Sequence, residues 1–227
     1  MILEIHILKV KDFILTLESK CNKMMTTTDI TAPNALNGLK MTPEAYLKHE
    51  RETTRESGGK YELFNQTLIF MAGASEAHNS IASNILALIK FFLWQNDEPS
   101  QVFQSDMKVI SFLNYKDYFY PDVVFIEEQT QYSDDQKDVL LNPTILFEVL
   151  SDGTEKFDRG DKFESYKKIE SLKEYDLVSQ YERKLEHFYK NKQGHWINGK
   201  TIKTGELSLL SIPLSLPLTQ IYHNMSI

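Results

Sequence analysis

Cysteine is almost absent from this chain of 227 residues, which contains only Cys21. A single thiol excludes an internal disulfide framework and offers no thiolate cluster for a zinc ion. Such usage is typical of a reducing compartment, so we expect the protein to lie in the cytoplasm. Long apolar runs are missing too, because charged residues interrupt the apolar N-terminal segment MILEIHILKVKDFILTLESK. We therefore expect neither a signal peptide nor a membrane span.

Positive charge is also scarce, since 25 lysine and arginine residues stand against 32 aspartate and glutamate residues and the net charge is −7. Nonspecific DNA affinity comes largely from basic side chains that release counterions from phosphates. The composition therefore argues against a protein that coats nucleic acid, and any DNA contact must be local or assisted by a metal ion. Internal repeats and a glycine-rich phosphate-binding loop are likewise lacking.

The length and the 41% content of hydrophobic residues predict one α/β domain with a single core. A polar stretch rich in threonine, asparagine, proline and glycine lies between residues 26 and 38 and lacks periodicity. We therefore predict an N-terminal extension and linker over residues 1–40, followed by a domain over 41–227.

Local patterns predict the elements of that domain. Two β-prone runs joined by Asn65 and Gln66 indicate a hairpin, because asparagine tolerates the positive φ of such a turn. Amphipathic or helix-forming segments predict helices at 42–55, 76–95 and 158–169. We expect strands at 101–104, 107–112, 120–126 and 144–150, with YDLVS, LEHFYK, HWI and GKTIK extending one edge of the sheet. The segment LSLLSIPLSLPL is expected to be extended and packed.

Two acidic residues lie within apolar strands, where a charged side chain is costly unless it is paired or bound to a metal ion. Asp122 begins the run DVVF, and Glu148 follows 26 positions later in the middle of ILFEVL. Carboxylates at matching heights on adjacent strands can share a divalent cation, and Mg²⁺ can activate water for attack on a phosphodiester. The pair therefore predicts phosphodiester hydrolysis at a sheet edge where both acids face solvent.

The sequence resembles the PD-(D/E)xK nuclease superfamily, through Pro121-Asp122 followed by Glu148. Over residues 40–190 it is similar to the bacterial "putative restriction endonuclease" family, formerly a domain of unknown function. The motifs that carry this resemblance are YELFNQTLIFMAGASEAHN, QSDMKV, YPDVVF, NPTILFEVLSDGTEKFDRGDKFESY and LKEYDLV. The resemblance implies a restriction-endonuclease-like α/β fold, with a central mixed β-sheet flanked by helices and additional β-hairpins. It also implies DNA as the substrate, Mg²⁺ or Mn²⁺ as the cofactor, and a homodimer.

The resemblance also implies roles for particular residues. Asp122 and Glu148 would bind the metal ion, with the carbonyl of Val149 as a further ligand. In the superfamily a lysine follows the glutamate by two positions, but Leu150 stands there in this chain. Lys162 on the following helix is the replacement that would assist the attacking water, and Glu62 would complete the site. Four further residues lie within the matching motifs, namely His78, Asp106, Asp158 and Tyr166.

The same residues also fit other interpretations. Asp122 is also explained by a hydrogen bond to a nearby turn, and Glu148 by a buried partner of opposite charge. Asp158 and Lys162 stand four residues apart, as in an ion pair on a helix surface, and His78 suits a cap or a packing position. For the whole chain, the alternatives are a nuclease-fold binding module without catalysis and another hydrolase with two carboxylates, such as a glycosidase.

Overall fold

The computed structural model describes residues 34–57 and 59–227, so residues 1–33 of the extension predicted over 1–40 lie outside the described part. Residues 34–41 hydrogen-bond to the segment around Leu68, for example through the N–H of Gly38. The domain boundary near residue 40 stays a prediction. Within the described residues, no helix has the length and apolar character needed to cross a bilayer.

A six-stranded mixed sheet forms the centre of the fold, in the order β11-β10-β9-β8-β6-β3. β8 and β9 are parallel and all other neighbours in this sheet are antiparallel. The strands are β3 (Gln101–Gln104), β6 (Val123–Ile126), β8 (Ile145–Leu150), β9 (Glu174–Ser179), β10 (Leu185–Lys190) and β11 (Trp196–Ile202). The predicted α/β fold with a central mixed sheet is confirmed.

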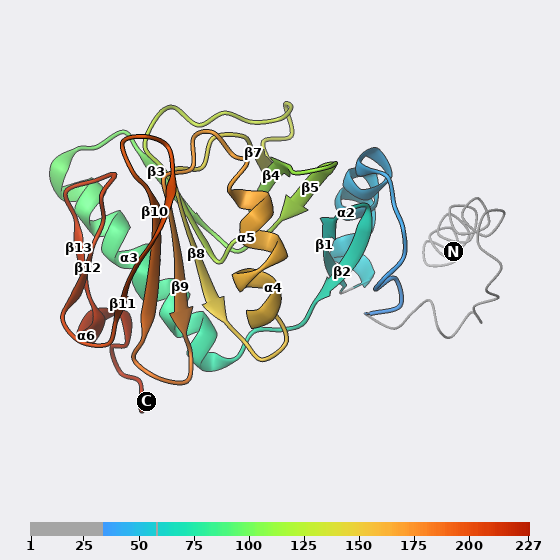
Figure 1. The fold of residues 1–227 in the computed structure, drawn as a ribbon. Coiled ribbons are helices and arrows are strands. Elements are labelled where there is room, and N and C mark those ends of the chain that lie inside the picture. The colour runs from blue at the N-terminus through green and yellow to red at the C-terminus, as the bar shows by residue number, and fades with distance from the viewer. Residues whose placement is uncertain (1–33, 58) are drawn as a thin grey trace, which may run out of the picture.

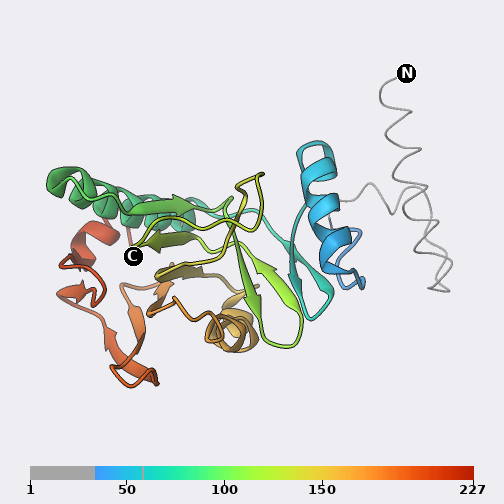
Figure 2. The same ribbon diagram turned by 90° about the horizontal axis from the view of Figure 1, so that it is seen from above.

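Helices cover both faces of this sheet (Figures 1 and 2). The long helix α3 (Glu76–Asn96) packs on one face, and two short helices, α4 (Glu155–Arg159) and α5 (Asp161–Tyr166), pack on the other. α3 begins where predicted because the side chain of Ser75 caps it by accepting from the N–H of His78. Near the α3 side, β12 (Glu206–Ser208), β13 (Ser215–Pro217) and α6 (Leu218–Ile221) add to the same apolar core.

A second sheet of five strands stands beside the first, in the order β2-β1-β5-β4-β7. Its strands are β1 (Lys60–Phe64), β2 (Thr67–Met71), β4 (Lys108–Phe112), β5 (Lys116–Phe119) and β7 (Val139–Leu140). Helix α2 (Pro43–Ser57) packs against it through the buried Tyr46. The predicted hairpin is confirmed as β1 and β2, and Asn65 and Gln66 have positive φ of 49° and 58°.

Two sequence expectations for the elements are wrong. The single helix predicted over 158–169 is broken at Gly160, whose ψ of −107° lies outside the helical range and separates α4 from α5. The strand predicted over 120–126 begins only at Val123, while the segment before it contains the separate strand β5. β5 belongs to the other sheet, so residues 120–122, which include Asp122, connect the two sheets.

Candidate active site

Asp122 and Glu148 face each other across the pair formed by β6 and β8. The antiparallel register pairs Val123 with Phe147, so its continuation places Asp122 opposite Glu148. Directly opposed residues in such a pair have Cβ atoms about 4.5–5.5 Å apart. A hydrogen bond of 2.7 Å from the N–H of Val149 to Asp122 Oδ2 fixes this arrangement. The structure therefore brings together the two acids that the sequence singled out.

Glu148 points toward the sheet face covered by α4 and α5. Side chains alternate along a strand, and the neighbours Leu146 and Leu150 pack in the same core as Phe163 and Tyr166 of α5. The residue is only 3% exposed, so the expectation that both acids face solvent is wrong for Glu148. The Tyr166 hydroxyl donates a hydrogen bond of 3.0 Å to Glu148 Oε1, and this bond orients the carboxylate.

Lys162 lies on helix α5 and contacts Glu148. The strand position at which the superfamily has its lysine is occupied here by Leu150, on the same face of β8 as Glu148. The Lys162 Nζ lies 2.9 Å from Glu148 Oε1, 2.9 Å from Glu62 Oε1 and 3.5 Å from Asp158 Oδ1. Lys162 and Asp158 are only 3% and 2% exposed, so the alternative of an ion pair on a helix surface is wrong. Both side chains point inward, although they come from the two separate helices on either side of Gly160.

Glu62 lies on β1 of the second sheet and belongs to the same cluster. It lies in the middle of β1, is 4% exposed, and contacts Lys162 through Oε1. The same oxygen accepts a hydrogen bond of 2.9 Å from the N–H of Tyr120, in the connection between β5 and β6. Asp106, by contrast, pairs with Lys60 and has a side chain that is 93% exposed, so it is separate from this cluster.

The buried charges in the cluster perturb one another strongly. Burial raises the pKa of Glu148 well above its ordinary value, and although Lys162 lowers it, Asp158, Asp122 and Glu62 add to the rise. Burial also raises the pKa of Glu62 and of Asp158, against the opposing effect of Lys162. For Lys162, burial lowers the pKa, but the three neighbouring carboxylates outweigh burial and raise it well above its ordinary value. One lysine thus stands among three buried acidic side chains.

His78 extends the cluster toward solvent. Its Nε2 lies 3.2 Å from Asp122 Oδ2, and the two side chains are 15% and 13% exposed. Burial lowers the pKa of His78, but the Asp122 carboxylate outweighs this effect and the pKa is raised. The sequence favoured a cap or packing role for His78. Since His78 precedes Asp122 by 44 positions, its place in the SEAHN motif was the only sequence signal that linked it to the site.

The donor set fits a hard divalent cation. Asp122 and Glu148 offer carboxylate oxygens from opposed positions, and their mutual repulsion is one cause of the raised pKa of Glu148. Across residues 34–57 and 59–227, no group of three or more His, Cys, Asp or Glu side chains is arranged to hold a metal ion. Mg²⁺ often binds proteins through one or two carboxylates and completes its shell with water and substrate phosphates. Two carboxylates and a backbone carbonyl are therefore a sufficient protein contribution.

Comparison with known proteins gives the family. The family model Uma2, described as "putative restriction endonuclease", matches residues 43–221. The chain belongs to the Uma2 family. Two proteins of Synechocystis sp. (strain ATCC 27184 / PCC 6803 / Kazusa) are each 32% identical to it, and both are described as uncharacterized. The protein sll1609 matches over 157 residues, 69% of this chain and 85% of its own length. The protein slr1290 matches over 187 residues, 82% and 94% respectively.

A solved structure supports the fold of this Uma2 chain. The crystal structure of a "putative nuclease belonging to DUF820" from Anabaena variabilis ATCC 29413 matches with a TM-score of 0.63 and 13% sequence identity. The match covers 80% of this chain and 97% of the other. At this identity the likeness concerns the fold, and it agrees with the restriction-endonuclease-like architecture that the sequence predicted.

Proposed function

We propose that this Uma2 protein is a divalent-metal-dependent nuclease that hydrolyses phosphodiester bonds in DNA. The observation that carries the proposal is the buried cluster in which Lys162 contacts Glu62, Glu148 and Asp158, beside the opposed pair of Asp122 and Glu148. Family membership supports it independently. A structural ion pair needs one acid for one base, whereas this cluster contains three carboxylates around a single ammonium group.

In this proposal Asp122, Glu148 and the carbonyl of Val149 hold Mg²⁺ or Mn²⁺. The bound metal would stabilise negative charge on the phosphate oxygens and lower the pKa of a bound water. Lys162 is a compact positive charge held in place by Glu62 and Asp158, and it orients the attacking water or the phosphate. Tyr166 fixes the Glu148 carboxylate through the hydrogen bond to Oε1. A homodimer stays a prediction, which sedimentation of the purified protein would test.

The test is calorimetric titration of Mg²⁺ and Mn²⁺ into wild type, Asp122→Asn and Glu148→Gln, followed by cleavage assays on plasmid, linear duplex and single-stranded DNA. Both substitutions keep the side-chain shape and remove one negative charge. Glu98→Gln is the matched control, because Glu98 is an exposed acid outside the cluster. We expect wild type and the control to bind the metal and cut DNA, and both site variants to lose these properties while keeping the circular dichroism spectrum of the wild type.

Two outcomes would contradict the proposal. Metal binding that is unchanged in both site variants would place the ion elsewhere. An absence of metal binding and cleavage in wild type, even with DNA present, would leave the alternative of a nuclease-fold binding module.

A further inference from the structure

Three segments meet beside the exposed edge of the acid cluster: the start of α3, the connection after β8, and the turn between β9 and β10 (Figure 1). Gln180 joins them, since its Nε2 donates to the carbonyl of Leu150 over 2.8 Å and its Oε1 accepts from the hydroxyl of Ser75. Ser75 caps the helix turn that carries His78. We call these segments (72–78, 151–156 and 180–184) the rim.

Tyr181 projects an aromatic ring from the rim and is 54% exposed. Its hydroxyl accepts a hydrogen bond of 3.1 Å from the N–H of Asp152. The Tyr222 hydroxyl stabilises the turn that carries Tyr181. It lies within hydrogen-bond distance, 2.9 Å, of the carbonyl oxygens of both Ser179 and Lys184. The ring is therefore held in place by the fold while its faces remain accessible to a ligand.

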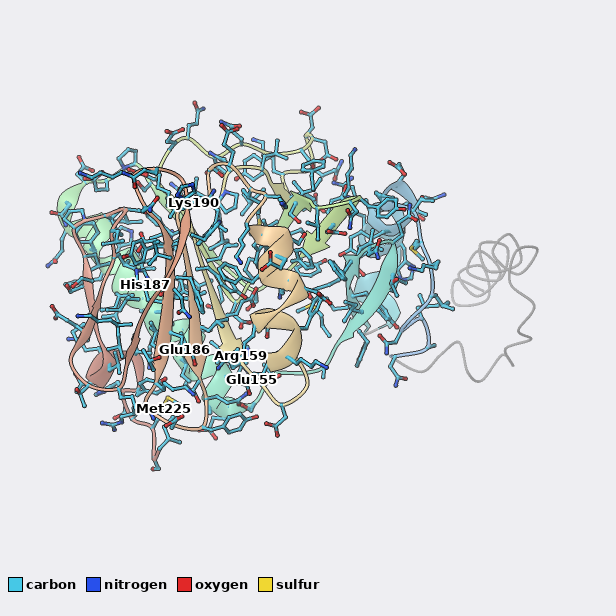
Figure 3. All side chains as sticks on the ribbon, in the orientation of Figure 1. Glu155, Arg159, Glu186, His187, Lys190 and Met225 are labelled. Carbon is cyan, nitrogen blue, oxygen red and sulfur yellow. The ribbon has the colours of Figure 1, made fainter. Side chains whose placement is uncertain are left out.

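Three of the acids around this ring, Glu155, Glu182 and Glu186, pair with neighbouring bases, whereas the exposed Asp152 forms no ion pair within the described residues. Arg159 pairs with Glu155 and Glu186, which Figure 3 shows close together at this end of the molecule. Glu182 pairs with both Lys184 and Lys203.

Two exposed basic residues of the rim remain available for a ligand. In the described part of the chain, neither Lys156 nor Arg183 forms an ion pair with an acidic side chain. The rim thus combines an accessible aromatic ring with two uncommitted positive charges.

We infer that the rim binds a single-stranded segment of the nucleic-acid substrate, with Tyr181 stacked on an unpaired base and Lys156 and Arg183 at the phosphates. This inference rests on the proposed nuclease function. Aromatic stacking needs a base whose face is free, as in a single strand, whereas bases in a duplex already stack on one another. The net charge of −7 also disfavours a duplex, whose binding depends on many phosphate contacts.

The distance between Tyr181 and the acid cluster suits one continuous strand. Asp152, which contacts Tyr181, follows Glu148 by four residues, and at about 3.3 Å per residue their Cα atoms are at most about 13 Å apart. A strand stacked at about 3.4 Å per nucleotide covers such a distance with at most about four nucleotides. A base on Tyr181 and a phosphodiester at the cluster can therefore belong to the same short segment.

The experiment measures binding of a fluorescent 20-nucleotide single strand and of the matching blunt duplex by anisotropy, in EDTA so that no cleavage occurs. Tyr181→Ala should weaken single-strand binding by about 5- to 150-fold, the range for losing one base–aromatic stack. Tyr181→Phe keeps the ring and should bind within about twofold of wild type. Trp94→Ala is the matched control, because Trp94 is 75% exposed and lies 16 residues, about 24 Å, along α3 from His78.

The salt dependence provides a second readout. Lys156→Ala and Arg183→Ala should each reduce the slope of log affinity against log salt by about 0.7, as expected for one phosphate contact with a single strand. The inference is overturned if Tyr181→Ala binds like wild type, if Trp94→Ala weakens binding equally, or if the duplex binds more tightly than the single strand. Failure of the proposed nuclease function would look different, because single-strand binding in EDTA would persist while no metal-dependent cleavage appeared.

Discussion

Replacing Glu148 by glutamine should stabilise the protein while abolishing cleavage. Burial and the neighbouring acids raise the pKa of Glu148 well above its ordinary value of 4.5, so the ionised carboxylate is less stable in the folded protein than in water. Glutamine is neutral at every pH, and its amide oxygen can still accept from Tyr166 and Lys162, which both contact Oε1. Lys162 keeps Glu62 and Asp158 as counter-charges.

The size of the effect follows from the cost of buried charge. Replacing a whole buried ion pair by hydrophobic residues of similar volume is often neutral or stabilises a protein by about 1–4 kcal/mol. Glu148→Gln leaves Lys162 with two other acidic partners, so the gain should be at most of this size. For a chain of this length, each kcal/mol raises Tm by about 2–4 °C. The stability gained by Glu148→Gln should depend on pH. In wild type, a group whose pKa is raised by folding contributes its full stability below its unfolded pKa. That stability is lost as the pH rises through the folded pKa. The difference between variant and wild type should therefore be small near pH 4 and largest at pH 8.

Thermal unfolding followed by circular dichroism at pH 4, 6 and 8, in EDTA, measures this difference. Glu98→Gln serves as the control and should change the free energy of unfolding by less than about 0.5 kcal/mol, as is usual for an exposed site. A Glu148→Gln protein that is less stable than wild type at pH 8 would refute the reasoning. Glu148 would then be needed as the counter-charge of Lys162, and its role would be structural.

Two further predictions concern the acid cluster and its neighbour His78, and a third concerns the close approach of β10 and β11. Lys162→Met should destabilise the fold by about 3–5 kcal/mol, because it leaves buried carboxylates without their base, and denaturant unfolding would contradict this if the midpoint were unchanged. His78→Ala should weaken Mn²⁺ binding by about 10- to 100-fold in calorimetry, because the ring orients Asp122, and an unchanged affinity would argue for a packing role. Gly199→Ala should cost about 1–3 kcal/mol, since a Cβ there would lie 2.6 Å from the carbonyl oxygen of His187, and a Tm equal to that of wild type would be evidence against this tight approach.

Elements defined by local signals were predictable from the sequence. The hairpin depends on Asn65 and Gln66, which adopt positive φ in the turn, and α3 depends on the apolar spacing that follows Ser75. β5 was missed because residues 116–119 pair with β4 and β1 of a second sheet, and such pairing leaves little local pattern. The break at Gly160 was missed because one glycine within a helical pattern also occurs in continuous helices.

The candidate site was predictable only where burial could be inferred from neighbours. Asp122 and Glu148 stand out because apolar residues surround them in the sequence. Lys162 and Glu62 came from family resemblance alone, since the charged residues around Lys162 also describe a solvated helix. The contact of His78 with Asp122 depends on how α3 crosses the sheet, which no local pattern specifies.

The charge balance of the cluster bears on the choice between an enzyme and an inactive nuclease-fold module. Glu62, Glu148 and Asp158 are each less than 5% exposed, and they share one lysine. Buried acids in excess of their bases cost folding free energy, and a module that only binds a partner would gain stability by losing one of them. A site that admits a divalent cation has a reason to keep the excess, because the cation supplies the missing positive charge. Glu148→Gln therefore distinguishes the two alternatives: an enzyme becomes more stable and inactive, whereas a module becomes more stable and keeps its binding.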